Sequence, residues 1–153
     1  RMRHPHVIEL IAIFEDPSSS SLYLQFPFYE HGQLDAWVQR EHPGLVPLRR
    51  AIWQIVQALK HLHAHGIAHS DVKPANILID HRASAHLADF DVSVDAGVRT
   101  SAARATQIGF SAGFAAPELA SSGASSAGDM FALGEVINSV TERSAEREEL
   151  CAT

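Results

Sequence analysis

The sequence predicts an α+β fold, and two kinds of pattern lead to this prediction. Two apolar runs of strand length stand near the N-terminus, at residues 7–14 and 22–28. Apolar residues with helical spacing follow at 48–65, and a second apolar helix is expected at 129–139. At 153 residues the chain is long enough to form one domain with a hydrophobic core of its own.

The first two runs are separated by residues 16–21, where Asp, Pro and Ser predict a hairpin loop. Pro27 lacks a backbone N–H, so the second strand is expected to end near it. A short helix is expected at 34–41, closed by residues 42–44.

The clearest helix is predicted at 48–65. Its apolar residues recur at alternating intervals of four and three, which places them on one face. These residues are Leu48, Ile52, Ile55, Leu59 and Leu62. Pro47 suits the first turn of this helix, and Gly66 suits its C-terminal end.

The second half of the chain predicts short strands, a long loop and one more helix. Three apolar segments are too short for helices and are interpreted as strands, at 67–68, 77–79 and 85–88. Residues 91–115 are rich in Ser, Ala, Gly and Thr and predict a long mobile loop, which in a compact domain is usually functional or disordered. The buried helix at 129–139 is followed by a charged, solvated tail at 141–153.

Composition and charge narrow the class of protein. An apolar content of 46% with 20% charged residues is ordinary for a soluble domain. The net charge of −6 argues against nucleic-acid binding. Cys151 is the only cysteine, which excludes an internal disulfide and fits a reducing compartment. Without a membrane-length apolar run or a signal peptide, we expect a cytoplasmic protein with no membrane partner.

Four polar residues suggest phosphoryl transfer. Asp71 offers a base for a hydroxyl group, and Lys73 offers a cation for a phosphate. Asn76 and Asp89 offer the oxygen atoms that magnesium prefers. Each residue alone is more often a turn former or a cap, so the prediction depends on the spacing of the whole set.

The order of the motifs resembles the protein-kinase family. Residues 69–76 resemble the catalytic loop, and Asp89 with Phe90 resembles the magnesium motif. Ala-Pro-Glu at 116–118 resembles the end of the activation segment, and residues 129–134 resemble the start of the central helix. Lys73 is similar to the lysine of the serine/threonine branch.

The resemblance implies ATP and Mg²⁺ as cofactors and a protein Ser or Thr hydroxyl as acceptor. It also implies a nucleotide site in which Phe26 gates the back of the pocket. Pro27 and Tyr29 would present backbone groups to adenine, Gln33 would contact the ribose and Leu78 would lie under the base. For Phe26 and Leu78, an ordinary strand or core position is an equally good interpretation.

Several positions depart from the family pattern. Ser70 stands where an Arg normally receives the activation-loop phosphate, so this switch is expected to be absent. Asp91 replaces a Gly, which predicts a tuned rather than an inactive enzyme. Ser111 matches a hydroxyl that contacts the catalytic Asp and Lys in the family. Glu118 is expected to lack the Arg with which it would pair.

The resemblance covers only part of a kinase domain. Residues 1–28 are expected to be the end of the small lobe and the hinge, 29–140 the core of the large lobe, and 141–153 the tail. The glycine-rich loop and the strand lysine would lie upstream. The parent protein is therefore expected to be a serine/threonine kinase, and these 153 residues alone are expected to be inactive. The alternatives are a pseudokinase or scaffold, a non-protein phosphotransferase, and a truncated product without independent function.

Ten histidines raise the alternative of a metal site. His61 and His65 are one helical turn apart, which suits two ligands of one zinc ion, although such residues often only cover a helix end. By resemblance, His69 instead packs under the catalytic loop against Phe90 and Leu10.

Overall fold

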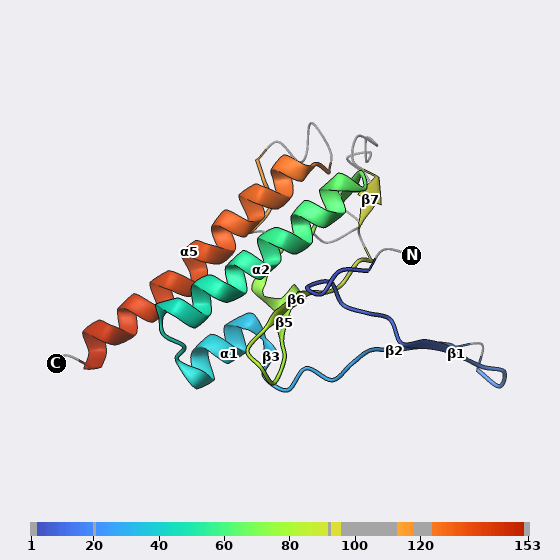
Figure 1. Ribbon diagram of the computed structural model, residues 1–153, viewed down its shortest axis with the longest axis horizontal. Coiled ribbons are helices and arrows are strands. Elements are labelled where there is room, and N and C mark those ends of the chain that lie inside the picture. Colours follow the sequence, from blue (N-terminus) through green and yellow to red (C-terminus); the bar gives the residue numbers. More distant parts are fainter. Residues whose placement is uncertain (1–2, 20, 92, 96–112, 118–123, 152–153) are drawn as a thin grey trace.

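The computed structural model describes residues 3–19, 21–91, 93–95, 113–117 and 124–151. In chain order the elements are β1 (Ala12–Asp16), β2 (Ser21–Gln25), β3 (Gly32–Gln33), α1 (Leu34–Glu41), α2 (Leu45–Ala64), β4 (Ile67–Ala68), the 3₁₀ turn η1 (Pro74–Asn76), β5 (Ile77–Ile79), β6 (Ala85–Leu87), β7 (Val94–Asp95) and α5 (Ser126–Cys151). A helical body carries a hairpin that projects away from it (Figure 1). The α+β class is confirmed.

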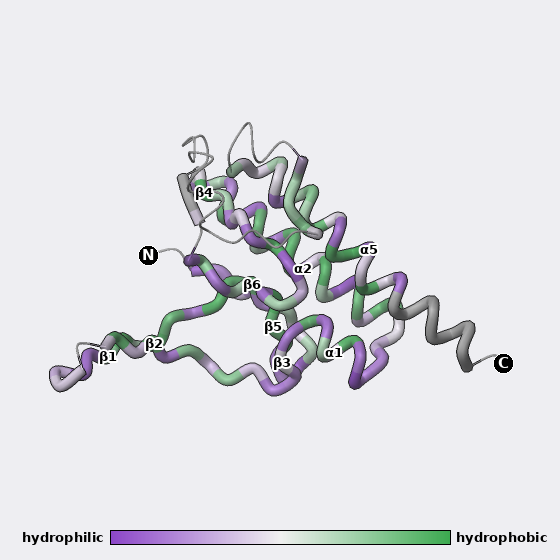
Figure 2. The backbone as a smooth tube through the Cα atoms, turned by 180° about the vertical axis from the view of Figure 1, so that it is seen from behind, coloured by the Kyte–Doolittle hydropathy of each residue, from purple (hydrophilic) through white to green (hydrophobic). Residues whose placement is uncertain are grey.

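The core lies between α2, α5, α1 and the small sheet. The helices α2 and α5 run side by side, and α1 lies near one end of the pair (Figures 1 and 2). The largest fully buried side chains come from all of these elements, and they include Leu34, Ile55, Leu59, Leu62, Ile77, Leu87, Leu133 and Val136. Burying each such side chain contributes about 1.5–3 kcal/mol, so this cluster is the main source of stability.

The helix α2 begins three residues earlier than the apolar pattern predicts, at Leu45. Gly44 occupies the N-cap position without a side-chain cap. The predicted C-terminal role of Gly66 is confirmed, because its φ is +73° and its N–H bonds to the carbonyl of His63 at 3.0 Å.

The strands β1 and β2 form an antiparallel hairpin in which Ala12 pairs with Gln25 and Asp16 with Ser21. The first strand was expected at 7–14, but its N-terminal half lies elsewhere. Val7 forms a parallel bridge with Leu87, and the Ile8 N–H bonds to the Leu87 carbonyl at 2.9 Å. Tertiary pairing with β6 therefore divides the apolar run into two parts.

A second antiparallel sheet has the order β3-β5-β6. The strand β3 has only two residues and was not predicted. Its register pairs Gln33 with Leu78, and the register of β5 with β6 pairs Leu78 with His86. This sheet connects the chain that leaves the hairpin to the segment that carries the catalytic-loop motif.

The helix α5 extends beyond both predicted ends. It begins at Ser126 because the Ser125 hydroxyl accepts a hydrogen bond from the Gly128 N–H at 3.0 Å, which caps the helix. It continues to Cys151, so residues 141–151 of the expected tail belong to the helix. Within the predicted long loop, β7 pairs with β4. Among the described helices, none is both long and apolar enough to cross a bilayer.

Candidate active site

Three of the predicted catalytic residues meet at one carboxylate. Oδ2 of Asp71 accepts a hydrogen bond from Lys73 Nζ at 2.6 Å and another from Asn76 Nδ2 at 2.9 Å. Asn76 Nδ2 also donates to the Asp71 backbone carbonyl at 2.9 Å. The turn η1 brings Asn76 back to the residue five positions earlier. The Asp71 carboxylate is therefore held in one orientation by a cation and an amide.

The start of this loop is held by a carboxylate that we had not predicted as a site residue. Asp129, at the start of α5, is 1% exposed. It accepts hydrogen bonds from the backbone N–H groups of His69 and Ser70 and from His63 Nε2, each at 2.8 Å. Ser70 has a φ of +72°, in the left-handed region, and these bonds hold it there. The available signal was an Asp at the start of a strongly apolar helix.

His69 links the catalytic loop to the segment before Asp89. Its Nε2–H donates to the Ala88 carbonyl at 3.0 Å, and its Nδ1 accepts the Asp71 N–H at 3.3 Å. Burial lowers the pKa of His69, which matches this neutral form. The ring lies 4.9 Å from that of Phe90 in an edge-on contact, so this part of the predicted packing is confirmed. The contact with Leu10 stays a prediction.

The two predicted magnesium ligands are neighbours. The Ala88 N–H bonds to the Asn76 carbonyl at 2.9 Å, which brings Asp89 next to Asn76. The Asn76 amide nitrogen donates both hydrogen bonds to Asp71, and within the described residues the Asn76 Oδ1 accepts none. Asp89 has a φ of +64° and its side chain is exposed. These hard oxygen donors fit a magnesium ion.

The Asp91 replacement causes no backbone strain in this conformation. The described non-Gly residues with positive φ are His42, Ser70, Ala83 and Asp89, and Asp91 is not among them. The residue with a positive φ is therefore Asp89, two positions before the residue at which the family pattern has a Gly.

The predicted nucleotide residues lie along the chain between the hairpin and β5. Gln33 and Leu78 are opposite each other in the β3–β5 register. Phe26 and Pro27 follow β2 directly. Tyr29 accepts the Gly32 N–H at 3.0 Å, so its carbonyl closes a turn. Their contacts with a nucleotide stay predictions.

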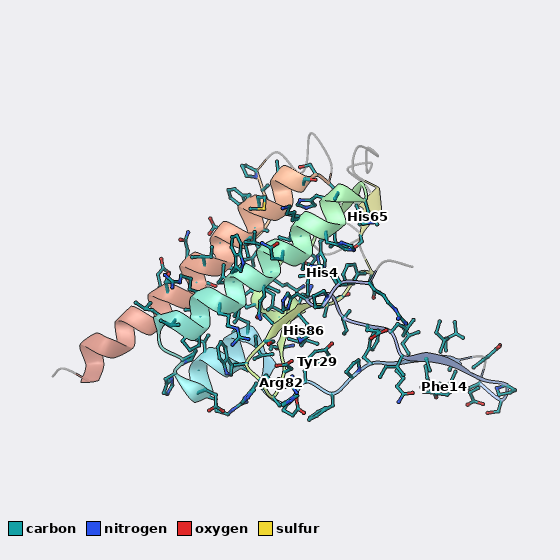
Figure 3. The ribbon with its side chains drawn as sticks, viewed as in Figure 1. His4, Phe14, Tyr29, His65, Arg82 and His86 are labelled. Carbon is teal, nitrogen blue, oxygen red and sulfur yellow. The ribbon has the colours of Figure 1, made fainter. Side chains whose placement is uncertain are left out.

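Tyr29 is also packed from the side of β6. Its ring lies 5.0 Å from that of His86, and the two side chains are neighbours in Figure 3. Burial is the main cause that raises the pKa of Tyr29, and nearby carboxylates add to it. This packing anchors the chain that leads out of the hairpin.

A small, partly open cavity of about 20 Å³, room for about one water molecule, lies beside Asp71 and was not predicted. It is formed by the catalytic loop, residues 114–116 and the start of α5. Its lining includes Ser70, Val72, Phe114, Ala116, Gly128 and Ala132. Small residues leave this space open next to the carboxylate.

Two predicted residues, Ser111 and Glu118, lie outside the described residues. The histidine pair is in contact, with the rings of His61 and His65 4.5 Å apart. Among the described residues there is no group of three or more His, Cys, Asp or Glu side chains arranged to hold a metal ion. The zinc alternative therefore gains no support.

Comparisons with known proteins agree with the motif order. The family described as protein kinase domain matches residues 1–147. A putative L-type lectin-domain containing receptor kinase V.8 from Arabidopsis thaliana is 31% identical over 171 residues, which cover 98% of this chain and 26% of that protein.

Two further relatives cover most of the chain. The serine/threonine-protein kinase TOS3 from Saccharomyces cerevisiae is 29% identical, covering 90% of this chain and 28% of that protein. The putative CBL-interacting protein kinase 13 from Oryza sativa is 33% identical, covering 90% and 27%. The chain thus spans about a quarter of the length of these relatives. Because the family match extends over almost the whole sequence, the chain belongs to the protein kinase family.

Proposed function

We propose that the protein to which this chain belongs transfers the γ-phosphoryl group of ATP to Ser or Thr hydroxyls of protein substrates. The observation that supports this most strongly is the Asp71 carboxylate, which Lys73 and Asn76 hold at 2.6 and 2.9 Å. A carboxylate oriented in this way can accept or orient the proton of an attacking hydroxyl.

In this proposal each residue of the set has a distinct role. Asp71 orients the acceptor hydroxyl, and Lys73 neutralises charge that develops on the transferred phosphoryl group. Asn76 and Asp89 would hold Mg²⁺, which would supply positive charge to neutralise the phosphates during transfer. The small cavity beside Asp71 leaves space for the acceptor hydroxyl next to the carboxylate.

The chain between the hairpin and β5 would bind the rest of the nucleotide. Phe26, Pro27 and Tyr29 would border the adenine, with Gln33 at the ribose and Leu78 below the base. The pairing of Gln33 with Leu78 supports a common site for these two residues.

Regulation is proposed to differ from the common phosphate switch. Ser70 cannot make the paired hydrogen bonds by which an Arg receives a phosphate. The Ser70 backbone N–H instead donates a hydrogen bond to Asp129 at 2.8 Å, so the catalytic loop is held at this residue without a phosphate. Ser111 and Glu118 stay predicted residues of the activation segment.

The test uses the parent protein with labelled ATP and a mixture of Ser, Thr and Tyr peptides. We expect phosphate on Ser and Thr, and a loss of at least about 100-fold in turnover with Asp71→Asn, as for removal of a general base. Asp16→Asn, in the hairpin turn, is the matched control. Phosphotyrosine alone, or turnover unchanged by Asp71→Asn, would contradict the proposal. ATP binding without transfer would favour the scaffold alternative.

The bare chain of 153 residues is expected to give no turnover in the same assay. By family order, the strand lysine and the glycine-rich loop that hold the phosphates lie outside it. Clear turnover of the bare chain that Asp71→Asn abolishes would show this prediction to be wrong.

A further inference from the structure

The helix α2 is positively charged in an acidic chain. Over its 20 residues it carries Arg49, Arg50 and Lys60 and no Asp or Glu, whereas the whole chain has a net charge of −6. All three cationic side chains are exposed. This concentrates positive charge on one helix surface.

The three cations share their side of the helix with large apolar side chains. Leu45 is 75% exposed, Val46 69% and Trp53 62%. At 100° per residue, the helix turns most of these residues away from Ile55, Leu59 and Leu62, which are fully buried, and Leu45 lies at the border between the two sides. We call the set of Leu45, Val46, Arg49, Arg50, Trp53 and Lys60 the outer α2 face.

Within the described residues, no carboxylate lies within 4.0 Å of Arg49, Arg50 or Lys60. Burial is the main cause that lowers the pKa of His6, and the nearby Arg50 charge adds to it. An exposed Trp beside two exposed Arg residues has the composition of an interface centre rather than of an ordinary surface.

We propose that the outer α2 face docks an acidic amphipathic segment of a partner protein. Carboxylates of that segment would pair with Arg49, Arg50 and Lys60, and its apolar side chains would cover Trp53 and Val46. None of these residues belongs to the catalytic set, so the proposal does not depend on phosphoryl transfer.

A protein segment fits this face better than a nucleic acid. Half of the six residues are apolar, and a phosphate backbone offers them no matching surface. The acidic remainder of the chain would also repel an extended polyanion. A peptide that alternates carboxylates with leucine matches both halves of the face.

The test measures binding of a fluorescein-labelled Glu/Leu peptide, with its acidic and apolar residues at helical spacing, to the full 153-residue chain. The anisotropy should rise on binding, and added salt should weaken the complex. A Lys/Leu peptide of the same length should not bind. The emission of Trp53 should shift to the blue, while Trp37, only 3% exposed, is already shielded.

Two variants locate the site. Arg49→Glu with Arg50→Glu should weaken binding by about tenfold or more, as expected when opposite charges become like charges. Trp53→Ala should weaken it by about fivefold or more, as for loss of an aromatic anchor. The control Arg82→Glu reverses an exposed charge in the β5–β6 turn and should leave the affinity unchanged. Acidic residues near the start of α2 suit the helix dipole, so the charge variant should fold.

Several outcomes would overturn the proposal. These are no binding of the Glu/Leu peptide, equal binding of the Lys/Leu peptide, or an affinity that neither variant changes. Binding of anionic vesicles or duplex DNA without the peptide would assign the face to another partner class. A dimer that forms without peptide and dissociates with the Arg49→Glu and Arg50→Glu changes would assign it to a second copy of the chain.

Discussion

The carboxylates of Asp129 and Asp16 accept three hydrogen bonds each, in regions of opposite character. Asp129 binds two backbone N–H groups and His63 in the buried centre of the helical body, at 2.8 Å each. Asp16 binds the backbone and hydroxyl groups of Ser18 and the hydroxyl of Ser19 in the hairpin turn, at 2.7–2.9 Å. The two carboxylates accept equal numbers of hydrogen bonds. If Asp16 were removed, water could replace it as the acceptor, whereas the donors around Asp129 would be left without an acceptor.

The same contrast separates the catalytic loop from the hairpin. The catalytic loop is held by the buried Asp129 carboxylate, whereas the hairpin exposes the apolar side chains of Phe14, Leu22 and Leu24. Figure 2 shows this apolar character along the projecting strands, and Figure 3 shows Phe14 far from the helical body. An isolated two-stranded hairpin is marginally stable in water. The conformation of the catalytic loop therefore depends on contacts with the helical body, and the hairpin contributes little to it.

The largest effect is expected from Asp129→Ala. The variant leaves the N–H groups of His69 and Ser70 without an acceptor in a buried place, which should cost about 3 kcal/mol or more in the free energy of unfolding. Urea denaturation of the 153-residue chain measures this.

The control is Asp16→Ala, which removes as many hydrogen bonds where solvent reaches the donors. Its unfolding midpoint should stay close to that of the unchanged chain. If the two variants lost equal stability, the contrast between the two regions would be wrong.

Local patterns predicted the elements that tertiary contacts do not redirect. The helix α1 (Leu34–Glu41) and the strand β5 (Ile77–Ile79) have the predicted bounds. The first strand was misplaced because β6 pairs with Val7 and Ile8. The end of α5 was misplaced because the apolar pattern stops near residue 140. The following Ala, Glu and Arg residues are strong helix formers and continue it.

The candidate site divides in a similar way. The set of Asp71, Lys73 and Asn76 could be predicted because all three lie within six residues, so spacing alone brings them together. Asp129 could not be assigned its role, since its partner groups are backbone N–H groups about 60 positions earlier. Backbone donors leave no signal in side-chain patterns.

The next effect is a loss of stability as the pH falls. The pKa values of His4, His6 and His69 lie below the usual 6.5, in each case mainly because burial disfavours the charged form. The unfolded chain therefore binds protons first as the pH falls below about 6.5. The stabilisation is complete above that pH and is lost as the pH falls through the folded pKa values.

Two of these histidines join the N-terminal segment to the body. His4 stacks on His61 at 5.0 Å, and His6 bonds to the Ala85 carbonyl at 3.0 Å. In urea titrations between about pH 7.5 and 5, the combined His4→Gln and His6→Gln changes should flatten the pH dependence of the midpoint. His81→Gln, at an exposed position, is the control. A midpoint that rises on acidification would contradict the sign of this prediction.

The smallest effect compares two glycines with equal space around them. A Cβ built at Gly66 or at Gly134 meets no atom within 4 Å, so backbone conformation alone decides each outcome. Gly66 has a φ of +73° where α2 turns toward the catalytic loop, and Gly66→Ala should cost about 1 kcal/mol. Gly134 lies within α5, and Gly134→Ala should add about 0.5–1 kcal/mol to the free energy of unfolding. Thermal unfolding of the two variants should show midpoints displaced in opposite directions. A midpoint that rises with Gly66→Ala would mean that the turn before the catalytic loop does not require the left-handed conformation, and a midpoint that falls with Gly134→Ala would contradict the expectation for α5.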